Sequence, residues 1–200
     1  GNRITAEEME YDGNTERGIA RKNVVLTDPK QTIKTETLYY DKIPNTAYFN
    51  TGGTIYSNDG SVMYTKSATY YLNSKMIDFI GRSNIETDKY TIVSDNIKQN
   101  QNTSISDFTG PTTIRDKRNT INYVYTELGS YNSKTGESFL NKNSRIHNNG
   151  KILTGDKLYF NRNTGFGKGT GNVTLDDPQQ KRFIKGGYGE IYEKKDSAMI

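Results

Sequence analysis

The feature that most constrains this chain is an internal repeat of about 30 residues. Counting the first apolar residue of a copy as position 0, a small residue follows at position 2, and apolar or aromatic residues recur at positions 5 and 7 in most copies. A repeat of this length indicates a body made by stacking similar units, each too small to fold alone. The six copies start at Ile4, Ile33, Met63, Ile92, Val124 and Leu153, which are 29–32 residues apart, and a partial seventh starts at Ile184.

Each copy also has a recognisable second half. At position 22 lies a branched aliphatic residue, and three copies carry a glycine four residues before it, namely Gly81, Gly110 and Gly171. The first and sixth copies share their exit, because Asp28-Pro29 and Asp177-Pro178 follow the aliphatic residue closely. The aliphatic residues at position 22 are Leu26, Ile55, Ile85, Ile114, Ile146 and Leu175.

The spacing within a copy predicts β-strands. Residues two apart lie on one face of a strand, and the change of parity between positions 2 and 5 requires a bulge or bend. A helix would prefer positions 0, 3, 4 and 7, and the Thr, Asn and Gly content disfavours it. We therefore expect an all-β, two-sheet repeat body of about 12–14 short antiparallel strands with essentially no helix. Turns are expected at 12–14, 44–45, 73–74, 134–136 and 161–163.

Composition limits the possible classes of protein. The 200 residues predict one repeat domain over residues 1–200, with six copies and a partial seventh at which the chain stops inside a unit. Only 32% of residues are hydrophobic, so the core must be thin. The net charge of +4 is mild and mixed along the chain, so we expect no nucleic-acid partner. No cysteine is present, and no apolar run is long enough for a transmembrane segment.

The sequence offers little for catalysis. Its single histidine, His147, is expected on the surface in a turn-like stretch, and one His without Cys cannot complete a zinc site or a nucleophilic triad. The carboxylate pairs at 7–8 and 176–177 are expected to be solvated strand or turn ends. The glycine-rich stretch 165–171 lacks the order of a phosphate loop. We therefore predict no enzyme activity, no catalytic residues, no metal and no cofactor.

The chain also contains fifteen tyrosines and seven phenylalanines, whose rings could contact a ligand. Aromatic rings stack on bases, sugars or lipids, and many of these rings occupy strand positions of the repeat. Inward tyrosines would favour a lipid groove, whereas an outward ladder of rings would favour sugar. A structural or carbohydrate-binding β-solenoid scaffold at the cell envelope therefore remains the alternative function.

The repeat resembles the OstA/LptA-like family of periplasmic proteins. The resemblance lies in the pattern apolar-Thr-Ala-Glu-x-Met-x-Tyr, followed by Gly and then Asn-Val-x-Leu. This pattern appears in Ile4–Tyr11 with Gly18 and 23–26, and again in Leu153–Phe160 with Gly167 and 171–175. It covers nearly the whole chain, and its specificity comes from repetition.

The resemblance implies a β-jellyroll of consecutive antiparallel strands and a role in lipopolysaccharide transport to the outer membrane or in its assembly there. It implies lipopolysaccharide or its lipid A part as ligand. It also implies head-to-tail self-association, or association with other lipopolysaccharide-transport proteins. The expected location is the periplasm, reached by export, although no signal peptide is present in this chain.

If the interior shelters acyl chains, the inward apolar positions of the repeat are the candidate lipid contacts. Burying one methylene is worth roughly 0.8 kcal/mol. The predicted lipid-binding residues are Met9, Tyr11, Leu26, Leu38, Tyr40, Ile55, Tyr70, Ile85, Ile97, Ile114, Ile146, Leu158, Phe160 and Leu175.

Overall fold

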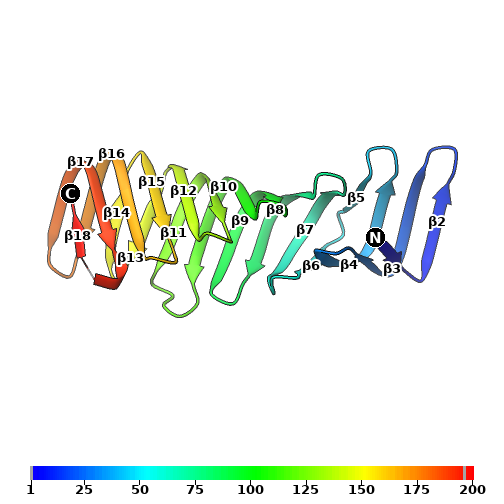
Figure 1. Ribbon diagram of the computed structural model, residues 1–200, viewed down its shortest axis with the longest axis horizontal. Helices are drawn as coiled ribbons and strands as arrows, with labels where there is room; N and C mark the ends of the chain where they lie inside the picture. Colours follow the sequence, from blue (N-terminus) through cyan, green and yellow to red (C-terminus); the bar gives the residue numbers. More distant parts are fainter. Residues whose placement is uncertain (1, 196) are drawn as a thin grey trace. The chain divides into compact units, whose positions relative to one another are not determined.

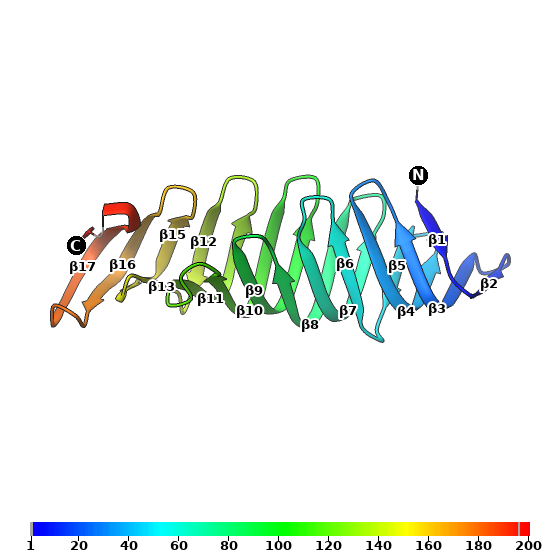
Figure 2. The same ribbon diagram turned by 90° about the horizontal axis from the view of Figure 1, so that it is seen from below.

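The computed structural model describes residues 2–195 and 197–200 and consists almost entirely of β-strands (Figures 1 and 2). Within these residues the one helical segment is the three-residue 3-10 helix η1, Glu193–Lys195. The predicted all-β class is therefore confirmed. The strands are β1 (Arg3–Thr5), β2 (Glu8–Asp12), β3 (Arg17–Thr27), β4 (Gln31–Asp41), β5 (Thr46–Phe49), β6 (Gly53–Ser57), β7 (Val62–Tyr71), β8 (Met76–Glu86), β9 (Tyr90–Asn100), β10 (Ile105–Asp116), β11 (Tyr123–Asn132), β12 (Glu137–Lys142), β13 (Arg145–Asn148), β14 (Lys151–Thr154), β15 (Lys157–Asn161), β16 (Phe166–Asp177), β17 (Arg182–Tyr192) and β18 (Ser197–Met199).

The chain falls into two compact lobes, which we describe separately. The first lobe comprises the residues up to Asp88 together with Asp95–Thr103, and the second comprises Lys89–Ser94 and the residues from Ser104 onward. Within each lobe the strands pair antiparallel and follow one another in chain order, as Figure 2 shows for the labelled strands. The single domain predicted over residues 1–200 stays a prediction.

Several short strands are halves of longer interrupted ones. In the first lobe β1 and β2 both pair with β3, and β5 and β6 both pair with β4 and β7. In the second lobe β12 and β13 both pair with β11, and β14 and β15 both pair with β16. Joining these four pairs reduces the eighteen described strands to fourteen, which agrees with the predicted 12–14.

The strands bulge near their midpoints, as the change of parity predicted. The pairing register shifts between Thr65 and Ser67 where β7 meets β8, and between Thr109 and Thr112 where β10 meets β11. Residues with positive φ lie at the bulges, and this conformation costs roughly 1–2 kcal/mol for a residue with a Cβ. That cost explains the glycines before position 22 in three copies. The bulge residues with positive φ are Lys22, Asn23, Gly52, Gly81, Gly110, Asn143, Gly171 and Asn172.

Buried hydroxyl groups form hydrogen bonds where the bulges interrupt the ladder. In the first lobe Ser83 Oγ lies 2.8 Å from Thr65 Oγ1 and 3.0 Å from the carbonyl oxygen of Gly81. In the second lobe Ser94 Oγ and Thr112 Oγ1 lie 2.7 Å apart. A backbone group buried without a partner is costly, so these hydroxyls explain the small polar residue found at position 2 in four of the six copies, Thr35, Thr65, Ser94 and Thr126.

The two halves of each bent strand face a common core. This is clearest in the second lobe, where residues on either side of the bulges belong to one buried cluster. The bend thus makes two layers from a single series of strands, which is the arrangement expected for a jellyroll. The cluster contains Val124, Ile146, Leu153, Val173 and Leu175, together with Leu140, Leu158, Phe160 and Ile191 from the halves beyond the bulges.

The turns form two rows, and all five predicted turns belong to the same row, which we call the first turn row. Each turn of this row contains a positive-φ residue at position 12, such as Asn45, Lys75 or Gly165. Successive turns are joined by backbone hydrogen bonds: the Leu72 amide donates to the Asn45 carbonyl at 3.0 Å, and the Glu193 amide to the Gly165 carbonyl at 2.8 Å. The second turn row joins β3 to β4, β6 to β7 and, in the second lobe, β10 to β11, β13 to β14 and β16 to β17.

The bulge geometry predicts a specific effect of Gly81→Ala. Gly81 has φ +82° and no atom within 4 Å of an added Cβ, so the substitution introduces backbone strain without a steric clash. We expect the free energy of unfolding to fall by about 1–2 kcal/mol in urea titrations followed by circular dichroism. Gly13→Ala is the matched control, since an added Cβ there also meets nothing but φ is not left-handed. Equal effects of the two substitutions would contradict this account of the bulge.

Candidate functional site

Most of the predicted lipid-binding residues share one buried interior face within their lobes. Their side chains are between 0% and 7% exposed, and each belongs to a strand whose alternate residues point outward. Whether they contact lipid stays a prediction. The buried members are Leu26, Leu38, Ile55, Tyr70, Ile85 and Ile97 in the first lobe, and Ile114, Ile146, Leu158, Phe160 and Leu175 in the second.

Three predicted residues are less covered. Met9 and Tyr11 are 54% and 56% exposed, because β2 is a terminal strand that pairs with β3 alone among the described strands. Tyr40 is half-buried, and its hydroxyl donates to Asn45 Oδ1 at 3.1 Å. The predicted stripe is therefore open at the N-terminal end of the first lobe.

Side chains pack tightly at two places in the interior, one in each lobe. In the first lobe a Cβ on Gly53 would lie 2.7 Å from the Phe49 ring, and in the second a Cβ on Gly167 would lie 3.0 Å from both Phe160 and Ile191. Contacts this tight leave no room beside these rings for an acyl chain unless side chains or strands move.

A polar cluster joins the two turn rows in the first lobe, and we call it the first clasp: Asp28, Tyr70 and Lys75. Asp28 lies in the turn between β3 and β4, and its carboxylate is wholly buried. It accepts hydrogen bonds from the Tyr70 hydroxyl and from the backbone amides of Lys30, at 2.6 Å, and Gln31, at 3.0 Å. Lys75 belongs to the other turn row and places Nζ 3.6 Å from the same carboxylate. Burial, followed by the bond to Asp28, raises the pKa of Tyr70.

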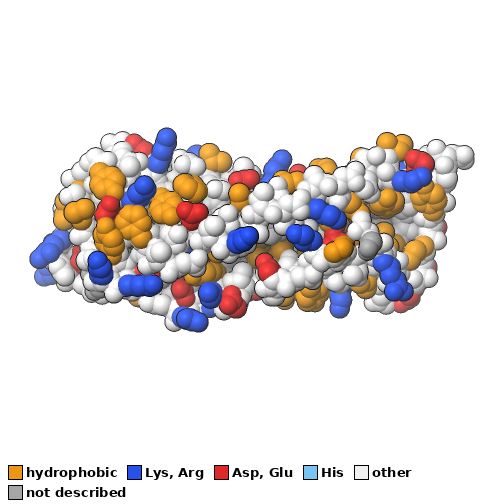
Figure 3. All heavy atoms as spheres, viewed as in Figure 1, with side chains coloured by type: hydrophobic (Ala, Val, Ile, Leu, Met, Phe, Trp, Pro, Cys, Tyr) orange, Lys and Arg blue, Asp and Glu red, His pale blue; other side chains and the backbone are white. Residues whose placement is uncertain are grey.

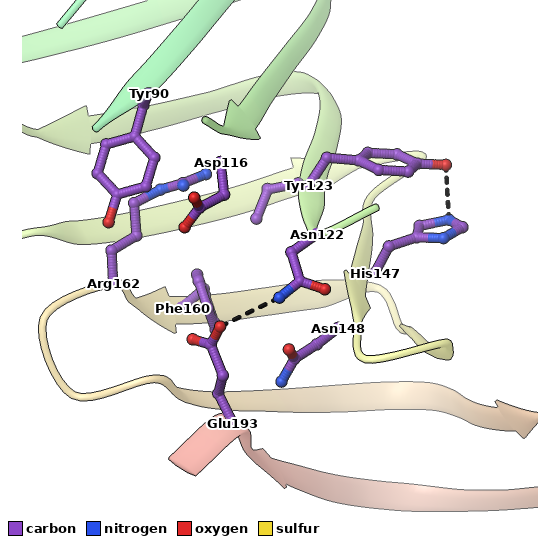
Figure 4. A pocket seen from close by; sticks show the side chains of 10 residues that line it. Tyr90, Asp116, Asn122, Tyr123, His147, Asn148, Phe160, Arg162 and Glu193 are labelled. Carbon is purple, nitrogen blue, oxygen red and sulfur yellow. Dashed lines mark hydrogen bonds between the residues drawn. The ribbon is translucent and has the colours of Figure 1, made fainter. Parts of the chain in front are cut away.

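The second lobe has an equivalent, which we call the second clasp: Tyr90, Asn122, Arg162 and Glu193 (Figure 4). The Arg162 guanidinium stacks on the Tyr90 ring at 4.2 Å, and its Nη2 donates to the carbonyl oxygen of Ile114 at 3.1 Å. Asn122 Nδ2 donates to Glu193 Oε1 at 3.1 Å. Burial lowers the pKa of Arg162 and raises that of Tyr90. Both lobes thus close the gap between their turn rows with charged and aromatic side chains.

The second clasp borders a small cavity of about 20 Å³, whose lining residues are drawn in Figure 4. Arg162 Nε and Asn148 Oδ1 are buried there without a hydrogen-bond partner among the described residues. A cavity of this volume holds one water molecule and is far too small for a lipid chain.

Two wider grooves lie beside the bulges, one in each lobe. The first-lobe groove, of about 500 Å³, is lined by residues near Thr35 and Gly53, and the second-lobe groove, of about 810 Å³, by residues near Lys142 and Asp156. Charged, amide and hydroxyl groups dominate the second-lobe groove, so it is a poor place for acyl chains.

Comparison with known proteins finds a family match for the N-terminal part of the chain. Residues 2–95 match the family model described as OstA-like protein. This stretch of the chain is OstA-like. No curated protein matches the sequence. Among solved structures, similarity is found to LptH from Pseudomonas aeruginosa, described as the LptA homologous periplasmic component of the conserved lipopolysaccharide transport device. The two chains are 15% identical with a TM-score of 0.46, over 50% of this chain and 76% of that one.

The OstA-like stretch contains the whole first clasp and the first-lobe part of the inward stripe, except Ile97. The later copies repeat the same positions, with Ile146 and Leu175 buried as Leu26 and Ile55 are. The predicted resemblance to the OstA/LptA-like family is therefore confirmed.

The prediction missed inward residues just after the first turn row. Positions 14 and 16 are also buried in the second to sixth copies, and they carry three fully buried rings of the interior, Phe49, Phe79 and Phe108. The signal was present, because two alternate residues follow every turn. The clasps were missed as well, since they join residues that lie 42 or more positions apart in the chain.

Two groups considered for chemistry lie elsewhere than expected. Asp177, expected at a solvated end, is buried, and its Oδ1 accepts a hydrogen bond from the Gln180 amide at 3.2 Å. His147 lies in β13 rather than in a turn; its ring stacks on Tyr123 at 4.0 Å, with Nε2 2.9 Å from the Tyr123 hydroxyl. Burial, and then the nearby Arg145 and Arg115, lower the pKa of His147. The described residues contain no cluster of three or more potential metal ligands and no helix able to span a membrane.

The first clasp predicts a pH-dependent effect of Tyr70→Phe. Removing a hydrogen bond to a buried carboxylate should lower the free energy of unfolding by about 1.5–3 kcal/mol at neutral pH. Because the pKa of Tyr70 is raised in the fold, wild-type stability is fully present below the ordinary tyrosine value near 10 and falls above it. The gap between wild type and variant should therefore narrow above about pH 10.

Urea midpoints at pH 7 and in the alkaline range measure this gap. Tyr71→Phe is the control, since Tyr71 is the adjacent tyrosine in β7 and is exposed. The first clasp would not contribute to stability in this way if the difference in free energy of unfolding were the same at both pH values, or if Tyr71→Phe lost as much stability as Tyr70→Phe.

Proposed function

We propose that this protein is a non-catalytic, periplasmic lipid-binding module in lipopolysaccharide transport to the outer membrane or in its assembly there. Its interior would shelter acyl chains of lipopolysaccharide or lipid A from water. The proposal rests on one observation: an OstA-like sequence presents a stripe of apolar side chains on the interior face of consecutive strands. Each methylene moved from water to such a surface contributes roughly 0.8 kcal/mol.

The packed interior requires an opening step in this proposal. Within each lobe, the two turn rows face each other across a gap that no covalent link spans. Side-chain contacts hold the two rows of a lobe together there. Opening a clasp would let an acyl chain replace protein side chains against the stripe. Lys75 and Arg162 lie at these openings, so they are the basic residues best placed to meet lipid phosphates.

The proposed partners include a second copy of this chain or other lipopolysaccharide-transport proteins. All five side chains of β2 are exposed, and β18 pairs with β17 over Glu190–Tyr192 alone. Terminal strands with unpaired backbone groups are ready to accept another strand. Head-to-tail association would therefore use Ile4–Tyr11 at one end and the Ile184–Tyr192 region at the other.

The alternative is a scaffold whose interior stays closed. The tight contacts of Phe49 and Phe160 with the neighbouring backbone favour it, because a spacer needs packing rather than space. The two functions differ in whether lipid ever reaches the inward side chains.

Photo-crosslinking tests the lipid proposal. A crosslinking residue at Tyr40 or Phe160, which face the interior, should capture radiolabelled lipopolysaccharide or lipid A with micromolar dependence on concentration. The same residue at Asn14, in an exposed turn, is the matched control and should capture little. Equal, uniformly low capture at all three positions would contradict the lipid proposal and would support the alternative, a scaffold with a closed interior.

Edge association predicts an effect of Thr5→Pro. Proline removes a backbone N–H from terminal strand β1 and should weaken concentration-dependent oligomers in analytical ultracentrifugation. Thr5→Val keeps the N–H and the β-branched shape, so its assembly should match that of wild type. Circular dichroism of both variants checks that the fold is retained. A wild-type protein that stays monomeric at high concentration would contradict the proposed edges.

A further inference from the structure

The second lobe carries a ladder of aromatic rings on its outer face. Phe139 of β12 pairs with Tyr159 of β15 at 5.3 Å between ring centroids, Tyr159 lies 6.3 Å from Phe166 of β16, and Phe166 lies 5.2 Å from Tyr192 of β17. We call these four rings the outer ladder. Figure 3 shows hydrophobic side chains gathered over these strands, with acidic and basic groups among them.

The outer ladder is not part of the core. Phe139 is 51% exposed, and the other three rings are partly exposed. Tyrosine exposure elsewhere fits this picture: Tyr70 and Tyr131 are buried, whereas Tyr48, Tyr56, Tyr64, Tyr71 and Tyr188 are exposed. Outward-facing tyrosines, which the sequence left open as an alternative, are thus more numerous than buried ones. Cross-strand ring pairs stabilise a sheet, but four rings in succession across four strands also make a continuous exposed platform.

Polar groups accompany the rings at hydrogen-bonding distance. The Tyr159 hydroxyl donates to Glu137 at 3.0 Å, and Lys168 Nζ lies 5.6 Å from the centre of the Tyr159 ring. Next to them, the Glu190 carboxylate accepts hydrogen bonds from the hydroxyls of both Tyr188 and Tyr192. These bonds lower the pKa of Glu190, so it is ionised at neutral pH.

The position of the charges indicates which ligand suits the surface. Lys168 and Glu190 are opposite each other in the pairing of β16 with β17, between the Phe166–Tyr192 pair and Tyr188. The centres of protein–protein interfaces are depleted in lysine and glutamate, so a protein partner fits poorly here. A sugar chain fits well, because each pyranose offers apolar C–H faces to the rings and hydroxyls to the charged groups beside them.

We infer that the outer ladder binds a glycan chain, with successive sugar rings stacked on Phe139, Tyr159, Phe166 and Tyr192. Glu137 and Glu190 would accept hydrogen bonds from sugar hydroxyls, and Lys168 would donate to them. The proposed occupant is the polysaccharide chain itself, recognised by its sugar rings and hydroxyls and not by any lipid attached to it. The ladder lies on the outer face, so this inference does not depend on the interior binding lipid.

Affinity gel electrophoresis of the full chain tests the inference. The immobile probe in the gel is polysaccharide released from lipopolysaccharide by mild acid, and cellohexaose added in solution is the competing free glucan. Tyr159→Ala and Phe166→Ala should each weaken retardation by about tenfold, the effect of losing one stacked ring of about 1.4 kcal/mol. Tyr159→Phe keeps the ring and should retain most of the binding.

Leu128→Ala is the matched control. Leu128 is an exposed aliphatic side chain on β11, the strand next to β12, and it should not matter for a ligand that recognises rings. Lipid A crosslinking at Phe160 should be the same in wild type and the ladder variants, which separates this inference from the lipid proposal. Cellohexaose should compete with the polysaccharide, because the outer ladder is expected to recognise sugar rings and hydroxyls.

Three results would overturn the inference. The first is the absence of retardation by the polysaccharide, and the second is an equal loss in Leu128→Ala. The third is a change of oligomeric state in Tyr159→Ala or Phe166→Ala at constant glycan affinity, which would assign the ladder to protein contacts. Melting curves of all variants establish that any loss is not unfolding.

Discussion

The structure depends on a single backbone constraint, the bend at the middle of each strand. A flat strand of this repeat would present its apolar residues to water, since the described strands form one sheet and no separate second sheet among them could cover these residues. The left-handed residues at the bulges, glycines such as Gly81 or asparagines such as Asn143, let one strand contribute to both layers. The buried hydroxyls of Thr65 and Ser83 then satisfy backbone groups that the bend leaves without ladder partners.

The repeat made much of this architecture predictable. The positions 0, 2, 5 and 7 located the strands, the parity change located the bulge, and the position-22 aliphatics proved buried, as at Ile55 and Ile114. Local spacing carries that information because neighbouring residues alternate across a strand. The exposure of Met9 was not predictable in the same way, since it depends on β2 being a terminal strand rather than on its own position in the repeat.

The clasps show what a repeat pattern cannot reveal. Asp28 and Tyr70 belong to different copies. Aspartate recurs at the position of Asp28 in two other copies and tyrosine at the position of Tyr70 in three, but the repeat spacing does not say which copies meet between the turn rows. Both lobes nevertheless arrive at a related solution, an ionic group set against an aromatic one between the turn rows. A buried carboxylate such as Asp28 is stabilised only while its hydrogen-bond and ion-pair partners remain in place. The contact between the turn rows is therefore stable when complete and is strongly weakened when one of its members is removed. Such a dependence on every member fits a contact that opens better than one that stays permanently closed.

The strict order of the strand pairing also shapes how each lobe comes apart. Within a lobe the strands bond to those next to them in the chain, and the turn carbonyls bond to the following turn, so almost every contact is made with an adjacent copy. A lobe built in this way can unfold strand by strand from its end. Loss of a terminal strand exposes the next strand and leaves the remaining pairs intact. Amide exchange in each lobe would then rise in a gradient from its inner strands to its free edge, instead of appearing as one cooperative event.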